Sequence, residues 1–259
     1  ISTTGAITHA ITGGTGTDTT NITVSAAFVN PSTIDTENVN MSVANGASVT
    51  VATATPFHAG VDAIVLTGGN SLSTFTTDVL NTALKSFDAA GFAGNVVVTV
   101  AADALDTTVT LTGSALTTDT VANTIATIGT AYALKSTGIE RAILDVNADA
   151  TVSLALTDAA EVDVDLAAAA TTATLTSAEG TLIRVTKSAT DSNTVVSLAD
   201  TTGAADTLAF ELDEVAASGD LIDGMNITVA DVETVSIKVD DAVSVDLSGL
   251  TMTTAGKTM

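Results

Sequence analysis

The segment Glu161-Val162-Asp163-Val164-Asp165-Leu166 alternates acidic and branched apolar side chains without a break. Because successive side chains of a β-strand point to opposite faces, this pattern places the carboxylates on one face and the apolar side chains on the other. The segment therefore predicts a strand with one face in a core. Its carboxylates repel one another unless water solvates them, a cation bridges them or another subunit contacts them, and all three interpretations stay open.

The same period of two recurs along most of the chain. Runs rich in Val, Ile and Thr are separated by turns that carry Gly, Asn or Asp, such as Asn45-Gly46. The sequence predicts further strands at 22–26, 48–52, 63–66, 95–100, 107–111, 151–156, 194–198, 207–212, 226–229 and 242–247.

Two stretches follow a helical period instead. Between Phe75 and Phe87 the apolar residues recur at spacings of three and four, and Gly91 is a natural stop. A weaker pattern places Val121, Ile125 and Ile128 on one face of 119–128. Both stretches predict short helices inside an otherwise β-rich chain.

Three segments resemble one another, and each leads into a strand. They are Ile34-Asp35-Thr36-Glu37-Asn38-Val39, Ile139-Glu140-Arg141-Ala142-Ile143-Leu144 and Val232-Glu233-Thr234-Val235-Ser236-Ile237. The following strands begin at Ala47, Ala150 and Val243, so the second and third copies share one offset and the first copy is two residues longer. Repeats of this kind predict stacked, irregular strand units, arranged as a β-solenoid or a sandwich-like fold.

Composition limits what the protein binds. The 259 residues include 30 Asp and Glu but only 7 Lys and Arg, which gives a net charge of −23. Such a base-poor chain repels nucleic acids and anionic membrane surfaces. No apolar run approaches the length of a membrane helix, so membrane insertion is not expected. The chain has no Cys, which excludes disulfides and thiolate metal sites.

The glycine-rich stretch Gly13-Gly14-Thr15-Gly16-Thr17-Asp18-Thr19-Thr20-Asn21 fits a calcium nonapeptide, except that Thr20 stands where an apolar residue is expected. Gly203-Ala204-Ala205-Asp206 is a degenerate copy. Together with the Glu-containing repeats, these residues make the chain resemble bacterial surface-layer proteins of the repeats-in-toxin class, which leave the cell by type I secretion. The resemblance implies a secreted, extracellular, non-enzymatic protein that assembles with itself on the cell surface and is stabilised by Ca²⁺.

Calcium binds oxygen ligands, and the sequence offers three groups of them. Gly14, Gly16 and Asp18 belong to the nonapeptide. Asp145, Asn147 and Asp149 alternate as the ligands of a calcium loop do, although the same residues suit a polar turn before the next strand. The third group comes from an acid-rich segment, 206–246, that holds 11 acids and only Lys238: Asp206, Asp220, Asp223, Asp240 and Asp241.

Catalysis is not expected. Only His9 and His58 would serve as general bases near neutral pH, and neither lies beside a nucleophile motif. A sugar-cleaving cleft would need aromatic platforms, and the chain has one Tyr and no Trp.

We therefore expect an all-β protein of three parts: a β unit at 1–70 with the nonapeptide, a mixed insertion at 71–135 with one or two short helices, and β units with acidic turns at 136–259. The expected role is a structural subunit of a calcium-stabilised surface layer or filament. Its main partner is another copy of itself, and cell-surface polysaccharide is a second expected partner. A module of a large secreted adhesin and a viral tail or capsid-decoration protein are the alternatives.

Overall fold

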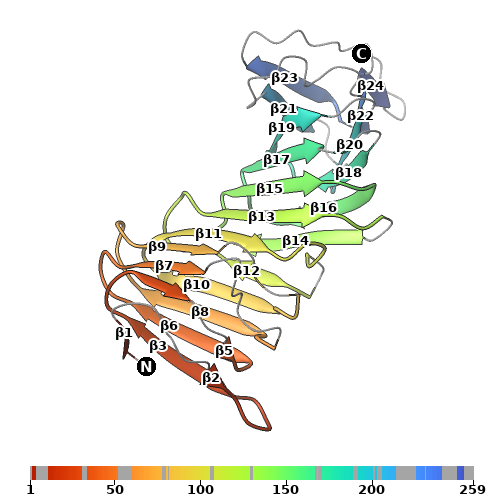
Figure 1. The fold of residues 1–259 in the computed structure, drawn as a ribbon. Coiled ribbons are helices and arrows are strands. Elements are labelled where there is room, and N and C mark those ends of the chain that lie inside the picture. The colour runs from red at the N-terminus through yellow and green to blue at the C-terminus, as the bar shows by residue number, and fades with distance from the viewer. Residues whose placement is uncertain are drawn as a thin grey trace. The chain divides into compact units, whose positions relative to one another are not determined.

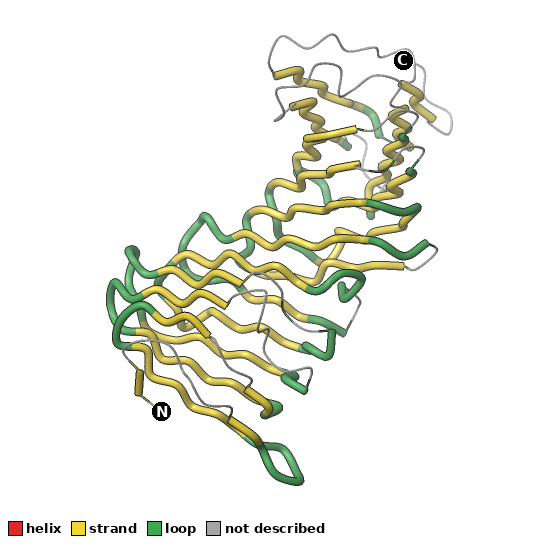
Figure 2. Tube along the Cα trace, in the orientation of Figure 1, coloured by secondary structure: helices red, strands yellow, loops and turns green. Residues whose placement is uncertain are grey.

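The computed structural model of the protein describes residues 2–3, 11–30, 34–51, 60–77, 80, 82–105, 108–128, 131–166, 168, 171–188, 192–200, 202, 206–213, 226–230, 232–240 and 250–253. All regular structure in these residues is β-strand, as Figure 2 shows. They include no helix that could cross a membrane.

The chain divides into two compact units, Ile1–Asn123 with Ser136–Glu140 and Thr124–Lys135 with Arg141–Met259. We call them unit 1 and unit 2. Each unit contains two parallel sheets (Figure 1), and successive strands along the chain go mostly to the two sheets in turn.

Unit 1 contains one sheet in the order β1 (Ser2–Thr3), β3 (Thr19–Val24), β6 (Asn38–Val43), β8 (Ala63–Gly68), β10 (Ser86–Phe92) and β12 (Thr110–Thr112). Its second sheet runs β4 (Phe28–Asn30), β7 (Ser48–Val51), β9 (Thr74–Thr77) and β11 (Asn95–Val100). The first residues of β13 (Thr120–Ile125) pair with β11. A short ladder joins β2 (Ile11–Thr12) to β5 (Ile34–Asp35).

Unit 2 repeats this plan. One sheet runs β14 (Ala131–Thr137), β16 (Ala150–Leu156), β18 (Thr172–Ser177), β20 (Asn193–Leu198), β22 (Asn226–Ala230) and β24 (Leu250–Thr253). The other runs β15 (Arg141–Val146), β17 (Glu161–Leu166), β19 (Leu182–Ser188), β21 (Thr207–Asp213) and β23 (Thr234–Asp240).

Each strand pairs in parallel with the strand one coil further along the chain. In unit 1, for example, Thr19 of β3 faces Asn38 of β6, which faces Ala63 of β8. A chain that returns to the same sheet after each turn, always in the same direction, forms a β-solenoid. This confirms the expected all-β fold of stacked strand units and selects the solenoid over the sandwich-like alternative.

The core lies between the two sheets and is filled by every second side chain. In β17 the side chains of Val162, Val164 and Leu166 are fully buried, as their alternation with acids predicted. The strands at 95–100 and 161–166 have the expected bounds, and most others differ by one to three residues. The strand expected at 242–247 lies outside the described residues.

The helix expected at 75–87 is wrong. This stretch contains β9, a corner and the start of β10. Phe75 and Phe87 point into the core from opposite sheets, and their ring centroids lie 5.4 Å apart. A corner between two strands changes which positions point inward. The inward residues of two consecutive strands can therefore recur at the spacings of three and four that are typical of a helix.

The helix expected at 119–128 is also wrong, because β13 occupies 120–125. Val121 and Ile125 are four residues apart, and this spacing satisfies both a helix and a strand. The β-branched residues Thr120, Val121, Thr124 and Ile125 favour the strand. Ile128, the third member of the expected apolar face, is 72% exposed beyond the strand.

Candidate functional site

Acidic residues join successive coils at the turns that precede strands. The backbone N–H of Asp18 donates to Oε2 of Glu37, 2.7 Å away, and the N–H of Asn38 donates back to the carbonyl of Asp18. The hydrogen bond from Asp18 lowers the pKa of Glu37. We call such an Asp and Glu pair on neighbouring coils a carboxylate clamp.

A second carboxylate clamp in unit 1 joins Asp119 to Glu140. The N–H of Asp119 donates to Oε2 of Glu140 at 2.8 Å, and the N–H of Glu140 returns to the carbonyl of Asp119 at 3.2 Å. The carboxylate of Asp119 is fully buried and accepts the backbone N–H groups of Val96 and Ser114. Both oxygens of this buried carboxylate are therefore satisfied by backbone donors.

The third clamp lies in unit 2. The N–H of Asp206 donates to Oε2 of Glu233 at 2.7 Å, and the N–H of Glu233 returns to the carbonyl of Asp206 at 3.2 Å. Asp206 is only 5% exposed, yet its Oδ2 has no hydrogen-bond donor among the residues that the structure describes. This carboxylate thus differs from that of Asp119.

The clamps correct the alignment of the three repeats. Glu37, and not Asp35, occupies the position of Glu140 and Glu233. Once Thr36 is aligned with Ile139 and Val232, the segments that the sequence predicts as the following strands begin at the same offset of 11 residues, because 47 − 36, 150 − 139 and 243 − 232 are equal. The extra two residues of the first copy therefore disappear.

The structure brings together two of the predicted nonapeptide residues. The backbone N–H of Gly14 donates to Oδ2 of Asp18, so this carboxylate closes its own loop. Gly16 is exposed and has a φ of 128°, a conformation that favours glycine. Asp18 therefore serves a turn and a clamp in the described structure.

The second predicted group is spread over two sides of a corner. Asp145 lies on the outward face of β15, where Thr124 donates to its Oδ2. Asn147 is exposed, and Asp149 accepts the N–H of Thr172 at 2.8 Å. These hydrogen bonds suit the polar-turn interpretation, although Oδ1 of Asp145 is buried and has no hydrogen-bond partner among the described residues.

In the part of the chain that the structure describes, no three Asp, Glu or His side chains are grouped so that they could hold a metal ion. Of the remaining predicted ligands, Asp240 is the last residue of β23. Asp220, Asp223 and Asp241 lie outside the described residues, as do His9 and His58.

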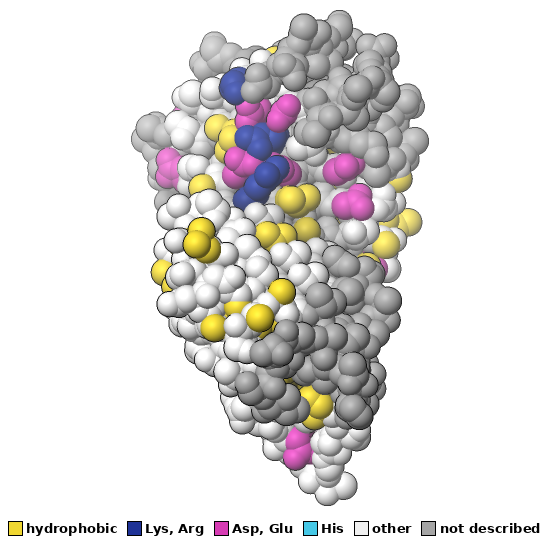
Figure 3. Space-filling view, turned by 60° about the vertical axis from the view of Figure 1, so that its left-hand side comes forward, with side chains coloured by type: hydrophobic (Ala, Val, Ile, Leu, Met, Phe, Trp, Pro, Cys, Tyr) yellow, Lys and Arg dark blue, Asp and Glu magenta, His cyan; other side chains and the backbone are white. Residues whose placement is uncertain are grey.

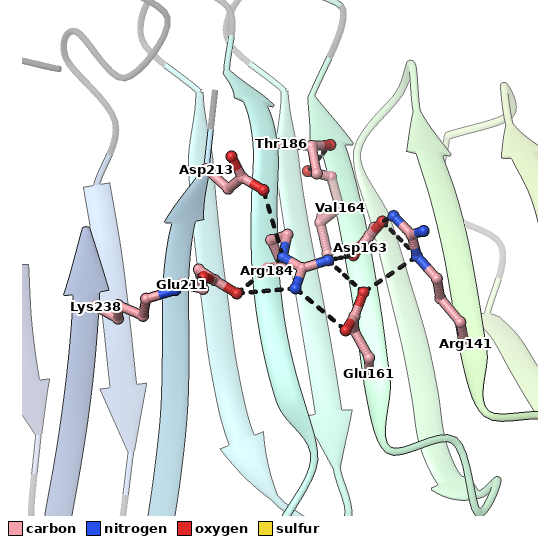
Figure 4. Close-up of polar contacts among 9 residues, drawn as sticks. All are labelled: Arg141, Glu161, Asp163, Val164, Arg184, Thr186, Glu211, Asp213 and Lys238. Atoms are coloured by element: carbon pink, nitrogen blue, oxygen red, sulfur yellow. Dashed lines mark hydrogen bonds and ion pairs between the residues drawn. The ribbon is translucent and has the colours of Figure 1, made fainter. Parts of the chain in front are cut away.

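Unit 2 carries a second charged feature, of which the sequence predicted the acids of β17 but not their basic partners. Figure 4 shows the members, which we call the charged face: Arg141, Glu161, Asp163, Arg184, Glu211, Asp213 and Lys238. They lie on the outward side of the β15 to β23 sheet, and Figure 3 shows basic and acidic side chains gathered there.

Strand register builds an alternating row in this charged face. Asp163 faces Arg184, Arg184 faces Glu211, and Glu211 faces Lys238 on successive strands. Neighbouring strands are about 4.8 Å apart, so opposite charges directly across from each other attract. Four strands therefore contribute one charge each to a single row.

Arg184 is the centre of the charged face. Its side chain is 18% exposed, and the guanidinium pairs with Glu161, Asp163, Glu211 and Asp213. Arg141 holds the other side of Asp163 and lies 3.1 Å from Glu161, while Lys238 pairs with Glu211. A planar guanidinium with several donors suits this bridging role.

The surroundings change the acidity of two carboxylates in opposite directions. Contacts with Lys238 and Arg184 lower the pKa of Glu211. Burial raises the pKa of Asp163, although Arg141 and Arg184 oppose the shift. Among the alternatives for the β17 acids, a solvated face is thus wrong for Asp163, which is 2% exposed, and the cations that bridge it belong to the chain itself.

A shallow groove of about 530 Å³ lies on unit 2. Its lining combines one exposed apolar side chain, that of Ile128, with Asp149 and the hydroxyls of Thr151, Thr172 and Thr174. Such a lining can contact a small polar molecule, but among its described residues there is no nucleophile paired with a base.

Comparison of the chain with family models, with curated proteins and with solved structures gives no significant match. The parallel two-sheet solenoid, its carboxylate clamps and its charged face therefore carry the functional argument.

Proposed function

We propose that the protein is a structural subunit of an extracellular, self-assembling layer or filament that calcium stabilises. The observation that carries this proposal is the use of acidic side chains to join coil to coil. Glu37, Glu140 and Glu233 each accept a backbone N–H from the preceding coil. Polar groups committed to stacking support a structural role.

Asp206 is the best-supported calcium ligand among the predicted residues. A buried polar atom without a partner costs free energy, and an ion is one way to satisfy it. In the part of the chain that the structure describes, Oδ2 of Asp206 and Oδ1 of Asp145 are such atoms. Asp145 is only half-buried and its other oxygen accepts the Thr124 hydroxyl, and Oδ2 of Asp18 already accepts the Gly14 N–H, so Asp206 ranks first. The nonapeptide that contains Asp18 and the degenerate copy that contains Asp206 thus differ in whether a carboxylate oxygen is left available to a cation.

Calcium titration of purified protein tests this proposal. We expect Ca²⁺ to raise the thermal unfolding midpoint and to promote assembly seen by light scattering, and EGTA to reverse both. The Asp206→Asn variant should lose most of the calcium response, while Asp18→Asn should keep it at a lower baseline stability.

Two results would contradict the proposal. If neither β-sheet circular dichroism nor assembly responds to Ca²⁺ or EGTA, calcium has no part in it. If the protein stays monomeric at high concentration with Ca²⁺ present, the adhesin alternative is favoured, and the groove beside Ile128 and Asp149 would be its first candidate ligand site.

A further inference from the structure

The turn between β6 and β7 contains Asn45-Gly46, which is the single Asn-Gly step of the sequence. Ala47 N–H donates to the Ala44 carbonyl at 3.0 Å and closes a β-turn. Gly46 has a φ of 73°, the left-handed conformation that this turn requires at its third position. Both Asn45 and Gly46 are exposed to solvent.

Asn-Gly is the step at which a side-chain amide is most open to attack by the following backbone nitrogen, because Gly places no side chain beside that nitrogen. The Gly46 nitrogen forms a bond to Cγ of Asn45, the Cγ–Nδ2 bond breaks, and ammonia leaves with the amide proton. Water then opens the cyclic imide at either carbonyl and yields Asp or isoaspartate. No electron transfer and no further reactant are needed.

In the structure, the N–H of this nitrogen donates hydrogen bonds to acceptors on the next coil. The Gly46 N–H donates to Oδ1 of Asn70 and to Oγ of Ser73, each at 3.0 Å. Ser73 is fully buried, and its Oγ also accepts the N–H of Asn70 at 3.1 Å. The N–H of Leu72 donates to the same Asn70 oxygen. The two acceptors therefore belong to a loop that its own hydrogen bonds hold in one conformation.

We propose that Asn45 is a site of spontaneous deamidation that the native turn keeps closed through these two hydrogen bonds. The attack requires the Gly46 nitrogen to lose its proton and turn toward Cγ of Asn45. Acceptors that hold the N–H oppose both movements. Deamidation then proceeds from states in which the β7 coil has separated from the loop at 70–73. The rate at which Asn45 is modified therefore reports how often those coils open.

Peptide mapping by mass spectrometry tests this proposal. Native protein and urea-unfolded protein are incubated at the same mildly alkaline pH, and Asp or isoaspartate at position 45 is measured over time. We expect the native rate to be at least about tenfold lower, since two hydrogen bonds must be lost. Equal rates in the two states would overturn the proposal.

Variants separate the hydrogen bonds from general stability. Ser73→Ala should raise the native rate about fivefold, and its matched control Ser71→Ala, in the same loop and exposed, should leave the rate unchanged. All variants should share one rate in urea. If Ser73→Ala does not fold, Asn70→Ala removes the other acceptor and should give the same acceleration. A folded acceptor variant that modifies at the wild-type rate would contradict the proposal.

Discussion

The outward faces of the two units differ in how they keep neighbouring strands in register. In unit 1, strands β4, β7, β9 and β11 contain no charged residue, and one row from β7 to the start of β13 reads Thr50, Thr76, Val97 and Thr120. In unit 2 the comparable row reads Asp163, Arg184, Glu211 and Lys238. The same solenoid thus tolerates an uncharged row and an alternating charged row.

Charge is needed where the register of neighbouring strands must be specified. A row of hydroxyls tolerates a slipped strand, because Thr beside Thr is acceptable in many registers. An alternating row does not, because a slip removes opposite-charge neighbours from a half-buried face. We infer that the charged face contributes specificity of register as well as stability in unit 2.

The largest expected difference between the units follows from removing the central cation. Arg184→Met leaves Asp163 and Glu211, both nearly buried, without their shared partner and should cost about 3–5 kcal/mol in the free energy of unfolding. Thr76→Met in unit 1 should cost no more than about 0.5 kcal/mol. Urea unfolding measures both.

Arg184→Lys keeps the charge but loses the planar guanidinium with its several donors. Its loss in the free energy of unfolding should therefore lie between those of Arg184→Met and Thr76→Met. A stability of Arg184→Met equal to that of Thr76→Met would show that the charged face contributes little.

An intermediate effect is expected from acid. Because the folded pKa of Glu211 lies below its ordinary value of 4.5, its contribution to stability is fully present above that pH and is lost as the pH falls through the folded pKa. Glu211→Gln should therefore flatten the stability of unit 2 across that acidic window.

Acid unfolding followed by circular dichroism provides the measurement, with wild type as reference. Unchanged acid sensitivity in Glu211→Gln would mean that other carboxylates control the response. The raised pKa of Asp163 acts with the opposite sign, since its protonated form is favoured by burial in the folded chain.

The smallest effect is expected from replacing one exposed lysine in each unit. Lys238 pairs with Glu211, whose side chain is 6% exposed, whereas Lys85 pairs with Asp62, whose side chain is 33% exposed. Lys238→Met should cost up to about 1 kcal/mol and Lys85→Met nearer 0.2 kcal/mol, and both losses should shrink in salt. Thermal unfolding at low and high salt distinguishes them, and an equal cost would remove burial of the partner as the cause.

Local alternation predicted the strands, because each inward side chain is specified by its immediate neighbours. The helix at 75–87 was predicted wrongly because the sequence alone does not show where a corner shifts the phase of Phe75 and Phe87. Unit 1 and unit 2 could not be separated from composition, since both alternate in the same way.

The sites were predicted only in part. Asp18 and Asp206 were found through their glycines, but Asp119 was missed because five residues separate it from Gly113 and no Gly-x-Gly pattern precedes it. A weaker signal existed, namely an Asp-Thr step at the start of each of three strands after a glycine. The charged face depends on pairing across coils, yet its spacings of 21, 27 and 27 residues (184 − 163, 211 − 184 and 238 − 211) match those of a solenoid coil.

The reach of each carboxylate clamp has a consequence for how the protein fails. Glu140 holds an amide one coil away and no further, so breaking it loosens a single junction. A chain of such junctions opens by local cracks, and strain at one coil is not transmitted to distant ones. Hydrogen exchange would then show protection that falls stepwise from coil to coil. A subunit damaged at one junction would keep most of its coils folded.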